Sequence, residues 1–276
     1  AAYTTQEFHL NELRPVLKEI GKQGLSINEV ETYMHNRHAV ERNGVIRERN
    51  DAFPDGGSGI NDAAAKAYLS ALSPAKRSRL EAVAKKLDVI TNGTLQVLQD
   101  SGIESAETIR NLRNAYKFYV PLFREGVDGG HALGTRGASV EGSALKAAVG
   151  SSKPVSSIIA NIVTQREAAI NRAEANRLGN TVFQAALENG DQAFWMVIDP
   201  STATPDQVRK QLAAMGMDPD LADDIFKSPT KRAYNKRTGN VDTIADTNFK
   251  RQPNVFATRV DGTDKFIVFN PDEKMA

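Results

Sequence analysis

Apolar residues recur every three or four positions through the first half of the chain, which is the spacing of one face of an α-helix. The pattern predicts a series of helices over residues 10–20, 26–48, 73–100 and 105–118. Ser26 and Glu29 form a capping box, because each side chain can accept a hydrogen bond from a free amide at the helix start. Asn61 is expected to cap a short alanine-rich helix. The longest helix is predicted over 155–187.

The last third of the chain mixes strand-like and helical patterns. A short buried strand and two helices are predicted there, at 194–198, 204–215 and 218–226. The polar residues 228–252 are predicted to be irregular. Two β-rich runs flank Asp261-Gly262 and predict a hairpin, at 255–260 and 265–269. Because an isolated hairpin is marginally stable, we expect it to pair with 194–198 or to pack on the long helix.

These elements predict a mainly α fold, a helical bundle with a long central helix and a small C-terminal antiparallel β-element, which places it in the α+β class. One change in composition predicts how the chain is divided into regions. Residues 126–142 contain six glycines and few large apolar side chains. We therefore expect an N-terminal helical region over 1–125, a glycine-rich linker or loop over 126–153, and a long helix with a small α/β region over 154–276. The first and last regions are free to pack as one domain.

Composition excludes several classes of protein. The chain of 276 residues has no cysteine, which rules out disulfide scaffolds, thiolate metal sites and cysteine nucleophiles. Its 35 basic and 34 acidic residues almost balance, which argues against a wholly basic nucleic-acid coat. The uncharged stretch 154–165 is too short to span a membrane. The chain lacks an initiator methionine and ends directly after a strand-like segment, so we expect a piece of a longer protein.

Glu31, His35 and His38 are the candidates for a metal site. They share one face of the predicted helix over 26–48, and two histidines one turn apart with a carboxylate can bind a divalent ion. Short histidine motifs of this kind occur often by chance. The favoured interpretation is a polar helix face without metal, on which the imidazoles form hydrogen bonds.

A second candidate site is a basic segment near the C-terminus, over residues 227–259. It holds eight basic residues against two acidic ones, with Tyr234 and Phe249 between them. Cations can neutralise phosphates and aromatic rings can stack on bases, so the segment is a candidate for nucleic-acid contact through Lys231, Arg232, Lys236 and Arg237. The favoured alternative is a solvated loop, because the chain as a whole is nearly neutral.

The glycine-rich residues 129–137 could present backbone amides to a phosphate, but no Gly-Lys-Ser/Thr follows, so they are not a P-loop. His131 within them could act as a general base, although no nucleophile or orienting partner stands beside it in the sequence. The chain has neither H-E-x-x-H nor G-x-S-x-G. We therefore predict no catalytic residue and no cofactor, and expect a protein that is not an enzyme. An enzyme or metal-binding domain with its site at His35 and His38 is kept as an alternative.

Four motifs occur in order along most of the chain. Residues 37–43 read R-H-A-V-E-R-N, residues 55–59 read D-G-G-S-G, residues 119–122 read Y-V-P-L, and the hairpin over 254–270 ends in F-I-V-F-N. Together they resemble a helical domain of the large polyvalent proteins of tailed bacteriophages.

The resemblance implies a very long multidomain protein that is packaged in the virion and delivered into the host cell with the genome. It implies partners among the other domains of the same polypeptide or other virion proteins, and DNA is a further candidate. It supplies no catalytic residues for this segment. On this interpretation Arg37, Glu41 and Arg42 form a structural clasp, since charge-assisted bonds from these side chains would lock their helix to its neighbours.

Overall fold

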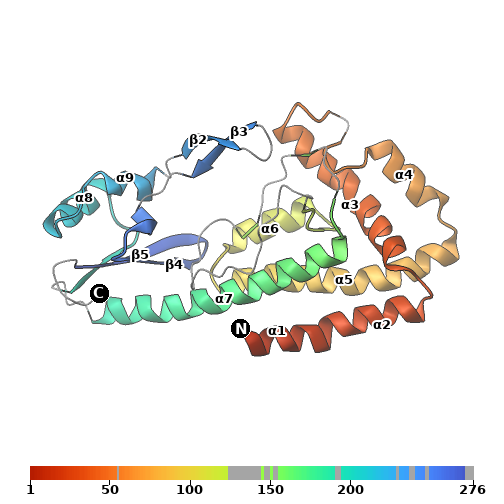
Figure 1. The fold of residues 1–276 in the computed structure, drawn as a ribbon, viewed down its shortest axis with the longest axis horizontal. Helices are drawn as coiled ribbons and strands as arrows, with labels where there is room; N and C mark the ends of the chain where they lie inside the picture. Colours follow the sequence, from red (N-terminus) through yellow and green to blue (C-terminus); the bar gives the residue numbers. More distant parts are fainter. Residues whose placement is uncertain are drawn as a thin grey trace. The chain divides into compact units, whose positions relative to one another are not determined.

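The computed structural model describes residues 1–54, 56–123, 144–145, 150–151, 155–189, 194–227, 230–235, 240–245 and 249–270. The fold is mostly helical with small antiparallel sheets near the C-terminus, which confirms the predicted mainly α, α+β class (Figure 1). The described chain divides into two compact units. Unit 1 contains residues 1–100, 106–123 and 144–171, and unit 2 contains 101–105 and 172–270. The division falls inside the longest helix, between Asn171 and Arg172.

Unit 1 is built from helices. Its elements are α1 (Ala2–Phe8), the π-helical turn η1 (His9–Leu13), α2 (Arg14–Lys22), α3 (Ile27–Arg49), α4 (Asp62–Ala71), α5 (Pro74–Asp100), α6 (Ala106–Ala115) and the first part of α7 (Ile158–Glu188). The predicted capping box is confirmed, because the Ser26 hydroxyl accepts from the Glu29 amide while the Glu29 carboxylate accepts from the Ser26 amide. Asn61 likewise caps α4 by accepting from the Ala64 amide at 2.7 Å.

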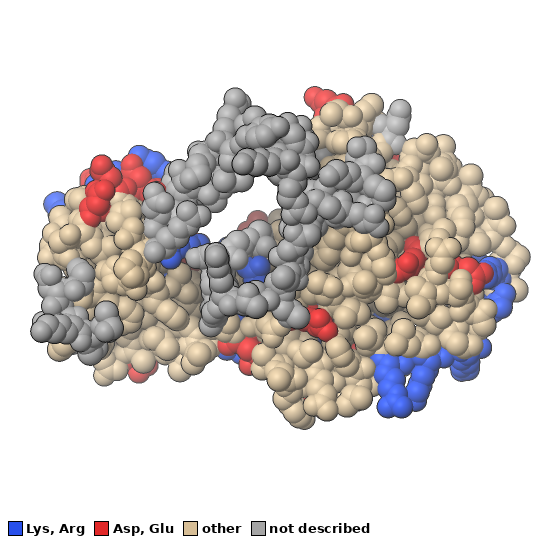
Figure 2. Space-filling model, in the orientation of Figure 1, with Lys and Arg blue, Asp and Glu red and all other residues tan. Residues whose placement is uncertain are grey.

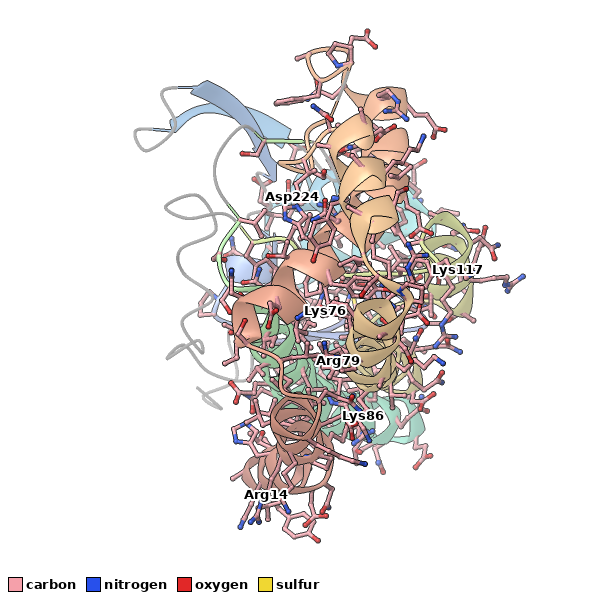
Figure 3. The ribbon with its side chains drawn as sticks, turned by 90° about the vertical axis from the view of Figure 1, so that its right-hand side faces the viewer. Arg14, Lys76, Arg79, Lys86, Lys117 and Asp224 are labelled. Carbon is pink, nitrogen blue, oxygen red and sulfur yellow. The ribbon has the colours of Figure 1, made fainter. Side chains whose placement is uncertain are left out.

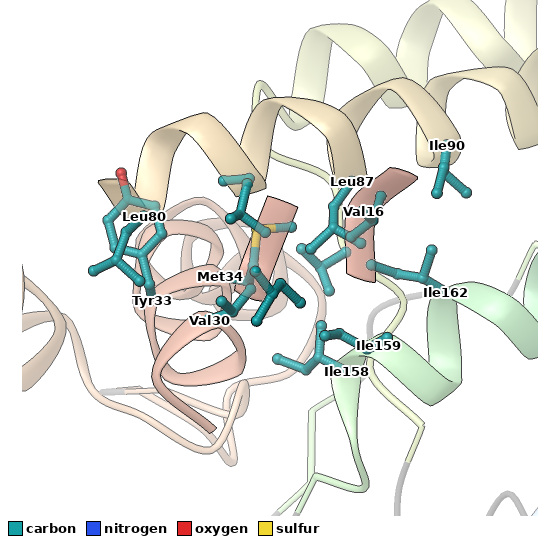
Figure 4. Close-up of a cluster of buried hydrophobic side chains, with 14 of the residues drawn as sticks. Val16, Val30, Tyr33, Met34, Leu80, Leu87, Ile90, Ile158, Ile159 and Ile162 are labelled. Carbon is teal, nitrogen blue, oxygen red and sulfur yellow. The ribbon is translucent and has the colours of Figure 1, made fainter. Parts of the chain in front are cut away.

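The core of unit 1 lies where four helices meet. Figure 4 shows ten labelled side chains from α2, α3, α5 and α7 packed together: Val16, Val30, Tyr33, Met34, Leu80, Leu87, Ile90, Ile158, Ile159 and Ile162. The period of three to four that predicted these helices is therefore the period of the buried face. Val30, Met34, Leu80 and Leu87 have no exposed surface, so α3 and α5 supply the centre of this core.

A π-helical turn at His9–Leu13 joins α1 to α2 in one continuous helical run. Arg166 of α7 contacts this turn, because its guanidinium pairs with Glu12 at 2.6 Å and lies over the Phe8 ring. Gly93 of α5 leaves room for the same guanidinium, since a Cβ at this position would lie 3.3 Å from Arg166 Nη1. Arg166 thus ties the N-terminal helices to the rest of unit 1.

Unit 2 contains a three-stranded antiparallel sheet in the order β1 (Trp195–Ile198), β5 (Thr263–Phe269), β4 (Val255–Val260). The predicted hairpin is present, and it pairs with the predicted strand near residues 194–198. Its two-residue turn has φ of 48° at Asp261 and 75° at Gly262. This left-handed conformation is the one that an Asp-Gly hairpin turn favours.

The central strand β5 is buried on both faces. Phe266 and Val268 face a cluster with Val208 and Leu212 of α8 (Pro205–Ala214) and Ala222 of α9 (Leu221–Phe226). Ile267 faces the opposite cluster with Phe183 and Ala186 of α7. Because successive side chains of a strand point to opposite faces, the run F-I-V-F is the pattern expected of a strand covered on both sides.

One prediction for the C-terminal region was wrong. Residues 228–252 were expected to be irregular, whereas β2 (Thr230–Asn235) and β3 (Asn240–Ala245) pair as an antiparallel hairpin, followed by the 3₁₀ turn η2 (Phe249–Arg251). The two strands lack the alternation of apolar and polar residues that sequence analysis uses to find strands. Among the helices that the structure describes, none is both long and apolar enough to cross a membrane.

Candidate functional site

The side chain of Arg37 joins α3 to α5. Its guanidinium donates two hydrogen bonds to the carboxylate of Asp88, one of them from Nη1 to Oδ2 at 3.0 Å. The same guanidinium stacks over the Phe118 ring, with Cζ 4.3 Å from the ring centroid. A bidentate pair of this kind is stronger and more directional than a single ion pair.

Glu41, one turn after Arg37, accepts a hydrogen bond from the Phe118 backbone amide at 3.0 Å. This contact explains why α6 ends at Ala115 and not at the predicted residue 118, because the Phe118 amide is bound by a side chain of another helix. Arg42 lies close to Tyr116. Burial raises the pKa of that tyrosine, and the Arg42 guanidinium opposes the rise.

Asn43 completes this set, and sequence analysis did not single it out. Its side-chain oxygen accepts from the Ser58 amide at 3.0 Å, and its amide group donates to the Ile60 carbonyl at 2.8 Å. His35 Nε2 donates to the Ser58 carbonyl oxygen at 2.9 Å. The segment 35–43 of α3 therefore holds the turn around Ser58, so two of the motifs behind the phage resemblance are in direct contact.

His38 is fully buried in unit 1. Its ring packs edge-on against Tyr116 and Tyr119, with centroids 5.2 and 6.2 Å away. Neither ring nitrogen has a hydrogen-bond partner of normal geometry among the described residues. Burial, followed by the positive charge of Arg42, lowers the pKa of His38 well below its usual value, so the ring is neutral.

The three metal candidates have separate partners. Glu31 accepts from the Ile159 amide at 3.0 Å and from the Ser157 hydroxyl, which caps the start of α7. His35 binds the Ser58 carbonyl, and His38 faces tyrosines. Within the described part of the chain, no three His, Cys, Asp or Glu side chains are grouped to hold a metal ion. The hypothesis of a site built from Glu31, His35 and His38 is therefore not supported by their geometry.

The cap also explains the start of α7. The sequence placed the start of this helix at residue 155, whereas α7 begins at Ile158. The Ser157 hydroxyl accepts from the Ala160 amide at 3.2 Å, so Ser157 and Glu31 together satisfy the first free amides of the helix. A carboxylate from another helix can supply such a cap only after folding, which is why the sequence alone pointed to a different start.

For the four residues that are candidates for nucleic-acid contact, the structure describes no side chain. Lys231 and Arg232 belong to β2, for which only the backbone is described, and Lys236 and Arg237 fall outside the described residues. The glycine-rich residues 129–137, including His131, also lie outside them. Contact between this basic segment and nucleic acid therefore stays a prediction.

Unit 2 has a buried polar cluster that no sequence motif predicts. Asn176 of α7 donates to the Ser101 and Arg259 carbonyls, each at 2.7 Å, and accepts from the Arg259 amide at 2.8 Å. The Thr258 hydroxyl donates to Asn180 at 2.6 Å. Asn176 has no exposed surface. The bonds to Arg259 and from Thr258 fix α7 against β4 within the unit, and the bond to Ser101 holds the residue that follows α5.

An ion pair between a buried lysine and a half-buried aspartate lies in the same unit. Lys265 of β5 pairs with Asp199 and donates to the Ser201 hydroxyl at 2.8 Å. Burial would raise the pKa of Asp199, but hydrogen bonds from Lys265 and Ser201 outweigh it and hold that pKa below its usual range. The Asp199 carboxylate neutralises the charge of a lysine that is almost fully buried, so we assign the ion pair a role in the stability of the fold.

No family model, curated protein or solved structure matches this chain. The resemblance to phage polyvalent proteins therefore stays a prediction that depends on the motifs themselves. Among the candidate functional residues, those of α3 in unit 1 have the contacts that the structure describes most fully.

Proposed function

We propose that this chain is a non-catalytic structural and interaction domain of a large phage virion or ejection-type protein, delivered into the host cell with the genome. Its partners would be other domains of the same long polypeptide or other virion proteins. Its location would be the virion and then the host cytoplasm or envelope.

One observation carries this proposal: three polar residues of the R-H-A-V-E-R-N segment are bound by other parts of unit 1. Arg37 binds Asp88, Glu41 binds the Phe118 amide, and Asn43 binds the turn at Ser58. Catalytic groups must face a substrate, whereas these side chains hold three separate segments together. The pattern supports a clasp that keeps a helical domain folded.

The virion location can be tested with an antibody raised against the purified chain. In purified particles of the encoding phage, we expect the antibody to detect a polypeptide much longer than 276 residues. After ejection is triggered in vitro, the same band should leave the particle fraction together with the DNA. A protein found in infected cells but missing from purified particles would overturn the proposal.

The clasp can be tested apart from the virion location. Arg37→Ala or Glu41→Ala in the phage-encoded protein should lower its amount in particles, because an unfolded domain is lost to proteolysis. Lys66→Ala changes an exposed side chain of α4 and is the matched control. Equal incorporation of all three variants would show that the clasp has no part in the function.

A further inference from the structure

Exposed cations gather on one face of unit 1, formed by α2 and the first half of α5. Residues 14–22 and 74–87 carry eight basic side chains against two acidic ones, Glu19 and Glu81. We name the eight the α2–α5 basic surface: Arg14, Lys18, Lys22, Lys76, Arg77, Arg79, Lys85 and Lys86. In Figure 2 the blue side chains gather at the lower right, over these two helices. Figure 3 faces this side and labels Arg14, Lys76, Arg79 and Lys86.

The two helices place their cations side by side. Lys86 Nζ lies 4.0 Å from Glu19 Oε2, and Arg79 donates to the Gln23 carbonyl at 3.2 Å. Because residue 86 meets residue 19 while residue 79 meets residue 23, α2 and α5 run in opposite directions at this contact. Arg79 and Lys86 therefore lie on the side of α5 that faces α2, while Lys76 pairs with Glu29 of α3 and Arg77 donates to the Leu69 carbonyl of α4.

Two acidic residues, Glu19 and Glu81, lie within these helical ranges, and both keep their negative charge because the groups that donate to them are neutral. Glu19 accepts from the Gln23 side chain at 2.7 Å, and Glu81 accepts from the Tyr33 hydroxyl at 3.3 Å. A hydrogen bond from Lys76, helped by Ser26, lowers the pKa of Glu29 to about 2, so this carboxylate neutralises Lys76. The remaining field of the surface is positive.

Three of the cations point to solvent without a carboxylate partner. Arg14, Lys18 and Lys85 are exposed and make no ion pair with any residue in the described ranges. Lys22 is also exposed, and after the hydrogen bond from Gln23 its positive charge contributes to the lowered pKa of Glu19. On α2, Arg14, Lys18 and Lys22 recur every four residues, which corresponds to a rise of about 6 Å per step. Each strand of a duplex carries one phosphate per about 3.4 Å of helix axis, so a row of this length can reach more than one phosphate.

We propose that the α2–α5 basic surface binds the phosphate backbone of nucleic acid without sequence preference. Flexible lysines and arginines neutralise phosphates, while readout of bases needs groups that enter a groove. The surface is distinct from the basic segment 227–259, and the inference does not depend on the virion role.

An anionic membrane is the competing occupant, and the apolar content of the surface argues against it. A helix that lies in a membrane interface needs an apolar face beside its cations. Within residues 14–22 and 74–87, Leu17 is the large exposed apolar side chain, and Tyr3 and Leu10 precede it in the same helical run. Three such side chains fall short of the wide apolar face that an interfacial helix needs, so a soluble polyanion fits the surface better.

The proposal is tested by fluorescence anisotropy with a labelled DNA duplex of about 20 base pairs, titrated at salt concentrations from about 50 to 200 mM. The wild-type chain should bind at low salt and weaken steeply as salt rises. The triple variant Lys18→Glu/Lys22→Glu/Lys85→Glu should lose at least about tenfold in affinity, and its salt slope should fall by about three. Circular dichroism and the melting temperature establish that the variant is folded.

Matched controls separate a local surface from net charge. Lys66→Glu/Arg110→Glu/Lys210→Glu changes the charge equally at exposed positions elsewhere and should bind like the wild type. Equal loss in both triple variants, or no wild-type binding at low salt, would overturn the proposal. So would a loss confined to Lys231→Glu/Arg232→Glu, or flotation with phosphatidylserine vesicles without DNA binding.

Discussion

Arg37 and Asp88 form a bidentate ion pair between α3 and α5, and the Arg37 side chain is only 8% exposed. Because water cannot replace Asp88 as the partner of a buried guanidinium, Asp88→Ala should lower the free energy of unfolding by about 3 kcal/mol. Arg37→Ala should cost a similar amount, and the double variant much less than the sum. Urea denaturation of the four proteins measures this coupling.

The same helix supplies the control for this cycle. Arg47 pairs with Asp62 at 3.0 Å, but its side chain is 40% exposed. Its removal should therefore cost less than about 1 kcal/mol. Equal costs for Arg37→Ala and Arg47→Ala would contradict the role assigned to the clasp.

Gly179 of α7 is required by a close approach to β4. A Cβ at this position would lie 2.7 Å from Thr258 Oγ1, so Gly179→Ala should destabilise the protein by about 1–3 kcal/mol. A Cβ at Gly44 of α3 would lie 3.9 Å from Arg47 Nη2, which is an ordinary contact, so Gly44→Ala should instead stabilise by up to about 1 kcal/mol, because alanine favours helix. Thermal melts of the two variants would refute this explanation if they shifted in the same direction.

His38 should make stability depend on pH. Burial lowers its folded pKa well below the unfolded value of about 6.5, so the unfolded chain binds the proton more readily. The free energy of unfolding should therefore fall as pH drops below about 6.5, by up to about 1.4 kcal/mol per pH unit. Chemical denaturation between about pH 5 and 7 measures this slope.

His38→Phe should remove this part of the slope, because a phenyl ring fits beside Tyr116 and Tyr119 and does not titrate in this range. His9→Gln is the control, since His9 is partly exposed and pairs with Glu167. An unchanged slope in His38→Phe would show that the buried ring is not responsible.

The separate partners of Glu31, His35 and His38 predict that zinc and nickel have no specific effect. Either ion should leave the melting temperature of the wild type unchanged, or shift it equally in His35→Ala/His38→Ala. A shift that is present in the wild type and lost in the double variant would restore the metal hypothesis. Glu31→Ala should cost about 1 kcal/mol without any metal, because it removes the cap of α7.

Much of the fold could be predicted because its signals are local. The capping box at Ser26 and the turn at Asp261-Gly262 each depend on a few consecutive residues. The hairpin β2–β3 could not, since residues 230–235 and 240–245 lack the apolar–polar alternation that identifies a strand and specifies its register.

The partners of the clasp could not be predicted from the sequence. Its helix and its charged residues could be predicted, but Asp88 lies 51 residues from Arg37 and Phe118 lies 77 residues from Glu41. Nothing in the spacing of either segment specifies these partners. The same limit applies to His38, because a histidine on a polar-looking helix face gives no sign that two tyrosines will enclose it.

The division of the chain inside α7 has a consequence for cutting the protein into fragments. A fragment that begins in residues 126–153 keeps Ile158, Ile159 and Ile162 but loses the side chains of α2, α3 and α5 that cover them. These isoleucines would face water and favour self-association. We expect such a fragment to aggregate on expression, whereas one beginning near Arg172 discards this apolar stretch but also loses residues 101–105, whose Ser101 carbonyl is a partner of the buried Asn176.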